Sequence, residues 1–212
     1  MNTPFGFEVV KVAEADFPSE YGLFRIYGFE GHFPKPDGSE TVEEAAVLVM
    51  GDPAAETAGA LAPLLRIHSQ CLTGDAFHSL RCDCRGQLEI ALKRIGEEGR
   101  GVIIYELQEG RGIGLMNKLR AYELQDRGAD TVEANEQLGF ESDLRKYRLP
   151  GAILAHFGIG SVRLLSNNPA KLSAVEAAGV KVAERVPCIA AAHDSRKVYL
   201  ETKKAKMGHL LG

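Results

Sequence analysis

Three cysteines in a short stretch are the clearest candidates for chemistry in this sequence. Cys71, Cys82 and Cys84 form a C-x10-C-x-C pattern within fourteen residues. Three thiolates can supply three corners of a zinc tetrahedron and leave the fourth for water, whose pKa the metal lowers to about 7. The spacing therefore indicates a metal site, either an open site that hydrolyses a substrate or a closed structural site with His68 or His78 as the fourth ligand; cysteines that bind no metal are the remaining alternative.

A glycine-rich segment at residues 109–114 (EGRGIG) lies between a predicted strand and a predicted helix. Glycines there let the backbone approach a ligand, and the N–H groups at a helix N-terminus bind anions. Because its glycines alternate, the segment matches neither a Walker loop nor the dinucleotide-binding pattern. A plain tight turn is the alternative, and Arg111 favours a phosphate-binding loop.

Two further polar segments have both a chemical and a structural interpretation. Asp143 and Arg145 are either a solvated ion pair or a general base beside a phosphate-binding guanidinium. Residues 166–169 (SNNP) have the composition of a helix start, and capping explains them. Lys171 falls in the first turn of that helix, where a cation opposes the helix dipole, so we expect it to meet an anion.

The elements that must position these residues alternate along the chain. Apolar and β-branched runs predict strands at residues 21–28, 44–50, 64–70, 101–106, 161–166 and 180–186. Apolar spacing predicts helices at residues 85–99, 114–127, 150–158 and 169–178. Residues 31–40 (GHFPKPDGSE) are expected to form an exposed loop, and residues 203–211 (KKAKMGHLL) a solvated helix face. Since no helix separates the first strands, we predict a single α/β domain with a mixed β-sheet flanked by helices.

The overall composition limits the classes of protein. The chain has 212 residues, 45% of them hydrophobic and 25% charged, which fits one globular domain. Its net charge of −4 lacks the basic excess of a non-specific nucleic-acid binder, so we expect no nucleic acid as partner. No apolar run approaches the roughly 18 residues of a membrane span, and no signal peptide is recognisable. We expect a cytoplasmic protein that does not bind membranes.

Five segments together resemble the GTP cyclohydrolase II family, whose members open riboflavin biosynthesis. They read RIHSQCLTGDAFHSLRCDC, ELQEGRGIGLMNKLRAYELQDRG, DTVEANEQLGFESDLRKY, LLSNNPAK and ETKKAKMGHLL, in that order. The resemblance runs from about Arg66 to the C-terminus, while residues 1–60 carry only a general likeness. It implies one domain over residues 1–212 with its catalytic core in residues 61–212, of the stand-alone type without a fused 3,4-dihydroxy-2-butanone 4-phosphate synthase.

The resemblance also implies a reaction and its metals. GTP would lose C8 of guanine as formate and its β,γ-phosphates as pyrophosphate, leaving 2,5-diamino-6-ribosylamino-4(3H)-pyrimidinone 5′-phosphate. Cys71, Cys82 and Cys84 would hold one zinc per subunit, with the fourth position left for water, and Mg²⁺ would accompany the GTP phosphates. A homodimer is expected.

The site residues follow from the same resemblance. Those that would bind GTP are Arg66, Ile67, His68, Ser69, Gln70, Gln87, Glu109, Gly110, Arg111, Thr131, Ser166 and Lys171. Asp143 would accept a proton, and Arg145 would take the guanylyl group as a nucleophile. Because a guanidinium has a pKa above 12 and no free lone pair, stabilising charge on the α-phosphate is the physically easier role for Arg145.

Other activities stay open at this point. One is a family member that releases pyrophosphate but retains the formyl group, giving a formamidopyrimidine nucleotide. Another is a zinc-stabilised GTP-binding protein without turnover. A zinc nucleobase deaminase is disfavoured because its H-x-E and P-C-x-x-C patterns are absent.

Three positions depart from the family pattern. Gln70 stands where the family commonly has glutamate, and Ser166 where it usually has threonine. After Cys84 the order is Arg85-Gly86, whereas the family commonly has the glycine directly after the cysteine. Gln70 keeps an acceptor but loses a charge, so we expect changed affinity before lost chemistry. The affinity of Gln70→Glu for GTP should differ from that of the wild type; equal affinities would contradict this.

Overall fold

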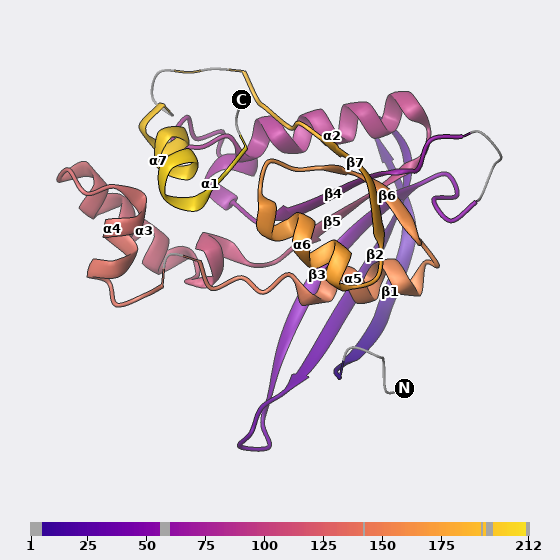
Figure 1. The fold of residues 1–212 in the computed structure, drawn as a ribbon, viewed down its shortest axis with the longest axis horizontal. Helices are drawn as coiled ribbons and strands as arrows, with labels where there is room; N and C mark the ends of the chain where they lie inside the picture. Colours follow the sequence, from indigo (N-terminus) through magenta and orange to yellow (C-terminus); the bar gives the residue numbers. More distant parts are fainter. Residues whose placement is uncertain (1–5, 56–59, 142, 192, 194–196, 211–212) are drawn as a thin grey trace.

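One seven-stranded sheet runs through the protein and carries helices on both faces (Figure 1). The computed structural model describes residues 6–55, 60–141, 143–191, 193 and 197–210. The strand order is β1-β2-β3-β5-β4-β6-β7. The strands are β1 (Glu8–Ser19), β2 (Gly22–Pro34), β3 (Glu40–Met50), β4 (Leu64–Ser69), β5 (Gly101–Glu106), β6 (Ser161–Leu165) and β7 (Lys181–Val186).

The sheet has an antiparallel half and a parallel half. Strands β1, β2, β3 and β5 pair antiparallel, whereas β5, β4, β6 and β7 run parallel. Hairpin turns join the early strands, and helices make the crossovers between the later ones, as parallel strands require. The predicted mixed sheet in an α/β fold is therefore confirmed.

The helices of the described residues lie in the last two thirds of the chain. They are α1 (Leu72–Asp75), α2 (Cys84–Glu98), the 3₁₀ turn η1 (Glu109–Gly112), α3 (Leu115–Asp126), α4 (Thr131–Gln137), α5 (Arg148–His156), α6 (Pro169–Ala177) and α7 (Lys197–Met207). The predicted helices and the strands from residue 64 onward are present within two residues of their expected bounds. Among the described residues, no helix is both long and apolar enough to cross a membrane.

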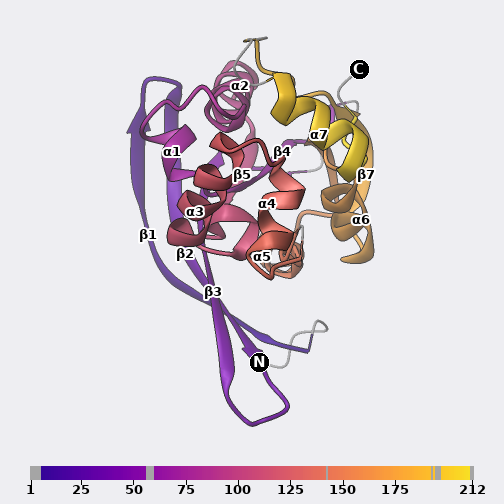
Figure 2. The same ribbon diagram turned by 90° about the vertical axis from the view of Figure 1, so that its left-hand side faces the viewer.

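Each face of the sheet packs its own apolar cluster. Ala91 and Ile95 of α2 pack with Ile103 on one face. Ile153 of α5 and Val175 of α6 belong to the larger cluster on the other face. Helices α3, α4 and α7 gather beyond the ends of the central strands (Figure 2).

The expectation of an exposed loop at residues 31–40 holds for residues 35–39 and is wrong for residues 31–34 and 40. Strands β2 and β3 include these five residues, in register down to Pro34 opposite Glu40, and form the long hairpin that projects from the body (Figure 1). Phe29 and Phe33 are buried on the same face, so the two-residue period of a strand persists into the part rich in proline and glycine. The turn is shorter, because the Lys35 N–H donates to the Ser39 carbonyl at 2.8 Å.

The strand order reverses at β4, and this places the site. The chain leaves β4 for β5 on one side, and later adds β6 on its other side. The two connections therefore diverge, and a crevice opens at the carboxyl ends of the parallel strands, which is where ligands bind in open α/β sheets. The cysteines, the glycine-rich segment and the SNNP turn follow β4, β5 and β6 directly.

Candidate active site

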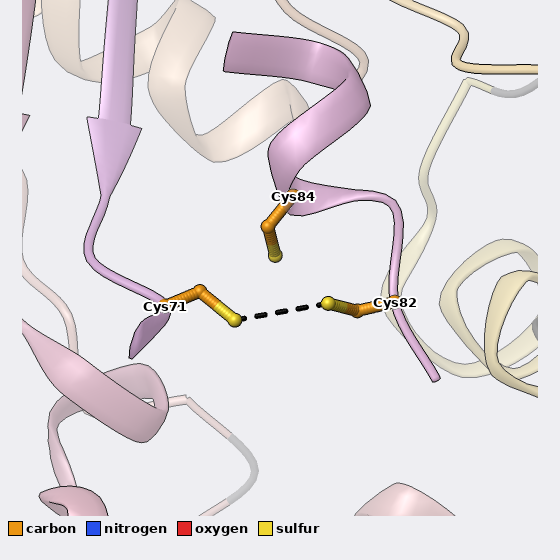
Figure 3. Close-up of side chains that lie close together, drawn as sticks. All are labelled: Cys71, Cys82 and Cys84. Carbon is orange, nitrogen blue, oxygen red and sulfur yellow. Dashed lines mark hydrogen bonds between the residues drawn. The ribbon is translucent and has the colours of Figure 1, made fainter. Parts of the chain in front are cut away.

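The three cysteines converge at the carboxyl end of β4. Cys71 follows that strand, Cys82 lies in the turn before α2, and Cys84 is the first residue of α2. Their sulfur atoms lie within 4.8 Å of one another, and those of Cys71 and Cys82 are 3.7 Å apart. Figure 3 shows the three side chains pointing toward one space.

This arrangement fits zinc. Zn–S bonds of about 2.3 Å in a tetrahedron place two sulfurs about 3.8 Å apart, close to the observed separation. Gly74 of α1 leaves the required room, because a Cβ there would lie 2.8 Å from Sγ of Cys82 and 3.1 Å from Sγ of Cys71. Within the described residues, no histidine or carboxylate joins the cluster as a fourth ligand. The described residues thus offer three thiol ligands and one open position.

Asp75 organises the surroundings of Cys71, and sequence reasoning missed it. Its Oδ2 accepts hydrogen bonds from the Cys71 N–H at 3.0 Å and the Tyr105 hydroxyl at 2.8 Å. His68 Nε2 lies 3.2 Å from the same carboxylate, so this predicted GTP-binding residue is held away from the sulfurs. Burial lowers the pKa of His68 to about 4, which leaves its imidazole neutral at pH 7.

Lys118 of α3 joins the cysteine cluster to the glycine-rich segment. Its Nζ lies 3.1 Å from Sγ of Cys71 and 2.7 Å from Oε1 of Glu109. The other Glu109 oxygen accepts the Leu72 N–H at 2.7 Å. Hydrogen bonds from the Cys82 and Cys84 thiols, with the charge of Lys118, hold the pKa of Cys71 far below its ordinary value. Sequence reasoning missed Lys118, which lies one helical turn after Gly114.

The glycine-rich segment adopts a left-handed backbone. Gly110 and Arg111 have φ of 62° and 61°, and Gly112 has φ of 93°. The Arg111 carbonyl accepts the Leu144 N–H at 3.1 Å, and a Cβ on Gly112 would lie 3.1 Å from Cβ of Leu144. Glycine at position 112 therefore lets this loop dock against the segment that carries Asp143 and Arg145.

Asp143 and Arg145 form a two-pronged ion pair. Arg145 donates from Nε to Oδ1 of Asp143 at 2.8 Å and from Nη2 to Oδ2 at 2.6 Å. Both side chains are half-buried. Burial alone would raise the pKa of Asp143, but the hydrogen bonds and charge of Arg145 hold it below its ordinary value. The solvated-pair alternative therefore does not describe this pair.

A buried polar chain extends from β4 to the C-terminal helix. Arg66 donates to the Gln87 side-chain oxygen at 2.6 Å, and Gln87 donates to Oδ2 of Asp83 at 2.7 Å. Lys203 of α7 donates to Oδ1 of Asp83 at 2.7 Å. Lys203 is buried, so the expectation of a wholly solvated face at residues 203–211 is wrong at this position; Lys206 of the same run is exposed.

Lys171 reaches under the end of β4. It is buried, and its Nζ donates to the Ile67 carbonyl at 2.8 Å. The Ile67 side chain itself belongs to the apolar core. Asn168 caps α6 by accepting the Ala170 N–H at 2.9 Å, and Ser166 accepts the Asn168 N–H at 3.1 Å. The predicted helix start is therefore present, and the lysine beside it faces inward.

One pocket gathers most of the predicted site. It is an open pocket whose empty volume, the solvent at its mouth included, is about 1080 Å³. The predicted residues that line it are Arg66, His68, Ser69, Gln70, Cys71, Cys82, Cys84, Gln87, Glu109, Gly110, Arg111, Thr131, Arg145, Ser166 and Lys171. Ile67 and Asp143 are not among the lining residues. The pocket is also lined by Lys118, Lys203 and His209, which sequence reasoning did not select.

The chain is closely similar to known enzymes over nearly its whole length. The family model for GTP cyclohydrolase II matches residues 10–187. A GTP cyclohydrolase-2 from Pseudomonas paraeruginosa is 53% identical over 205 residues, which cover 96% of this chain and 94% of that protein. One from Shewanella amazonensis is 51% identical over 201 residues, covering 94% of this chain and 92% of that protein. With a matching family model and these relatives, the chain belongs to the GTP cyclohydrolase II family.

Proposed function

We propose that this chain hydrolyses GTP to 2,5-diamino-6-ribosylamino-4(3H)-pyrimidinone 5′-phosphate, formate and pyrophosphate, the first step of riboflavin biosynthesis. The observation that carries the proposal is one pocket, in a member of this family, that combines a three-thiolate cluster with buried cations. Zinc, when bound by Cys71, Cys82 and Cys84, supplies a Lewis acid and a water of lowered pKa. The protein's own side chains then hold the guanine on one side of the zinc site and the phosphates on the other.

Glu109 is the proposed acceptor for guanine N1–H and the exocyclic amine. Its carboxylate offers about four acceptor positions, and Lys118, Gly110 and Leu72 occupy three of them, so guanine fills the fourth and its second donor displaces one of these three. These donors fix the orientation of the carboxylate before substrate arrives. The Tyr105 hydroxyl donates to Asp75, whose carboxylate also accepts the Cys71 N–H, so Tyr105 helps to position the loop that carries Cys71.

Arg66, Arg111 and Lys171 are the proposed phosphate ligands, together with Mg²⁺ carried by the substrate. Lys171 is fully buried, and this desolvation is the main reason that its pKa lies well below its ordinary value. A triphosphate beside it adds anionic charge and favours the charged ammonium. Local cations of this kind allow a chain of net charge −4 to bind GTP.

For Arg145 we propose charge stabilisation at the α-phosphate. The Arg145 guanidinium already donates two hydrogen bonds to Asp143. A phosphate that replaces this carboxylate can accept the same two hydrogen bonds. Asp143, released from the pair, becomes able to accept a proton. A nucleophilic role for Arg145 would require loss of its proton at a pKa above 12.

Arg145→Ala is expected to lower kcat by at least about 100-fold, because it removes a charge-stabilising donor from the reacting phosphate. Arg148→Ala is the matched control: this exposed arginine pairs with Glu43 on the surface and should keep kcat within about twofold. A rapid-quench time course on the wild type separates the two roles. A covalent guanylyl adduct on Arg145 would contradict charge stabilisation.

We further propose one zinc per chain, a homodimer and a cytoplasmic location. Sulfur-only ligation supports zinc over harder divalent ions. Val12 of β1 and Leu23 of the neighbouring strand β2 are exposed apolar residues, 58% and 67% accessible, and β1 is an edge strand whose unpaired backbone groups can pair with a partner. Metal analysis tests the zinc content, and the solution mass of the zinc-loaded protein tests the homodimer.

The decisive test is mass spectrometry of the products after the zinc-loaded protein is incubated with GTP and Mg²⁺, with formate and pyrophosphate assayed in the same tube. Equal amounts of both, with the diaminopyrimidine 5′-phosphate, support the proposal. Pyrophosphate without formate indicates the formamide-retaining reaction. Unchanged GTP with verified zinc indicates a binding protein.

A further inference from the structure

A buried acid that the mechanism above does not use lies at the end of β5. Glu106 is 1% exposed. Among the described residues, neither of its carboxylate oxygens has a hydrogen-bond partner. A buried carboxylate without hydrogen bonds is costly, and glutamate is seldom fully buried unless it is paired. Nearby positive charges are therefore needed to stabilise the ionised form of this carboxylate.

The sheet separates Glu106 from the cysteines. Val102 and Ile104 of β5 belong to the larger apolar cluster under α5 and α6, and strand alternation puts Glu106 on that same face. Tyr105 points the other way, to Asp75. Glu106 thus follows Val102 and Ile104 on one face of β5, the face that packs against α5 and α6.

The groups around Glu106 are the proposed phosphate-binding residues and their neighbours. Lys171 from α6 and Arg145 from the segment before α5 stabilise its ionised form, whereas Glu43 of β3 and Asp143 oppose it. The ring of Tyr147 lies between the two cations, 5.1 Å from Nζ of Lys171 and 5.3 Å from the Arg145 guanidinium. On β4, the residue opposite Glu106 is Ser69, which is uncharged.

We propose that Glu106 is a positioning residue: its carboxylate balances Lys171 and Arg145 before substrate binds, and it takes up one proton from solvent when a triphosphate binds to those cations. This deepens the proposed function and rests on it. The incoming phosphates take over the role of counter-charge, so an ionised Glu106 would add a further negative charge on the buried side of the same cations. Protonation removes that charge, and the proton returns to solvent when the products leave.

The sign of the pH dependence follows from linkage. Burial raises the pKa of Glu106 to about 7, partly offset by Lys171 and Arg145. Bound phosphates raise it further, so the complex holds more protons than the unliganded protein above pH 7. Phosphate affinity should therefore weaken as pH rises from 7 toward 9, by up to about tenfold per pH unit.

The test is calorimetric titration of the zinc-loaded protein with inorganic tripolyphosphate at pH 8, in two buffers of different ionisation heat. This probe carries the triphosphate chain but no ring to open. The wild type should take up about 0.5–0.9 proton more than Glu106→Gln, and the variant's affinity should vary less between pH 7 and 9. The variant's KM for GTP should show the same flattening, with kcat at saturation little changed.

Two controls keep the result interpretable. Glu43→Gln removes a neighbouring acid that already accepts from Gln108; because Glu43 raises the pKa of Glu106, this variant should take up somewhat less proton than the wild type but clearly more than Glu106→Gln. Melting temperature reports folding: loss of the counter-charge of Lys171 should lower it, so the affinities of the variant are compared at temperatures well below its melting transition.

Equal proton uptake by the wild type and Glu106→Gln overturns the inference, as does a wild type that does not bind tripolyphosphate. The formate assay with GTP is read separately. If formate forms and uptake is equal, only the inference fails. If uptake differs and no formate forms, the proposed reaction fails and the proton-linked phosphate site stands.

Discussion

Gly74→Ala should abolish zinc binding although it alters no ligand. The added Cβ would lie 2.8 Å and 3.1 Å from two of the three sulfur atoms, and 3.2 Å from Cβ of Cys84. These contacts are shorter than van der Waals separation, and the short helix α1 is held against the cluster by the bond from the Cys71 N–H to Asp75. We expect zinc content to fall from about one to below about 0.1 per chain, and turnover of GTP to fall at least about 100-fold.

Gly160→Ala is the matched control for this substitution. Gly160 has nothing within 4 Å of an added Cβ and does not have a left-handed backbone. Metal content by mass spectrometry and the melting temperature should match the wild type. A Gly74→Ala protein that retains full zinc content would show that α1 moves aside easily and would refute the steric argument.

Lys203→Met should destabilise the fold by about 3–5 kcal/mol, because it leaves Asp83 buried without its cation. The side chains of Lys203 and Asp83 are only 10% and 4% exposed. Burial alone would raise the pKa of Asp83, but the charge and hydrogen bond of Lys203 keep it below its ordinary value. Asp83 lies between Cys82 and Cys84, so we also expect weaker zinc binding. Urea unfolding of the zinc-loaded protein measures the first effect.

Lys206→Met on the same helix separates burial from charge. Lys206 also pairs with acids, Asp130 and Glu133, but its side chain is 41% exposed. Its removal should cost about 0–1 kcal/mol. Adding Asp83→Asn to Lys203→Met should recover part of the lost stability, since the uncompensated charge is then gone. Equal losses from the two lysine substitutions would contradict a special role for the buried pair.

The sequence was most informative where local periodicity decides the element. Helix α2 and strand β5 were predicted nearly to the residue, because apolar spacing and Gly99, with φ of 67°, mark their bounds. Strand β1 was missed because most of its side chains are exposed, so neither face shows apolar alternation. Its existence depends on pairing with β2, which is a tertiary contact that local sequence does not encode.

The site divides in the same way. The cysteines could be selected because their type and spacing suffice to suggest a metal. Asp75, Lys118 and Glu106 could not, since an acid or lysine is ordinary in any sequence and acquires meaning only when folding buries it beside a partner. Lys203 lies in a basic run whose composition is typical of a solvated surface, so the sequence did not predict that this lysine is buried.

The span between Asp83 and Lys203, 120 positions along the chain, sets an order of events during synthesis. All three metal ligands leave the ribosome within one stretch of fourteen residues, long before α7 is made. A nascent chain can therefore acquire its metal early, whereas the acid between two of the ligands stays unneutralised until the last helix emerges. If the cysteines bind zinc as proposed, this separation predicts that the ligand set can be complete in a nascent chain before Lys203 is available to neutralise Asp83.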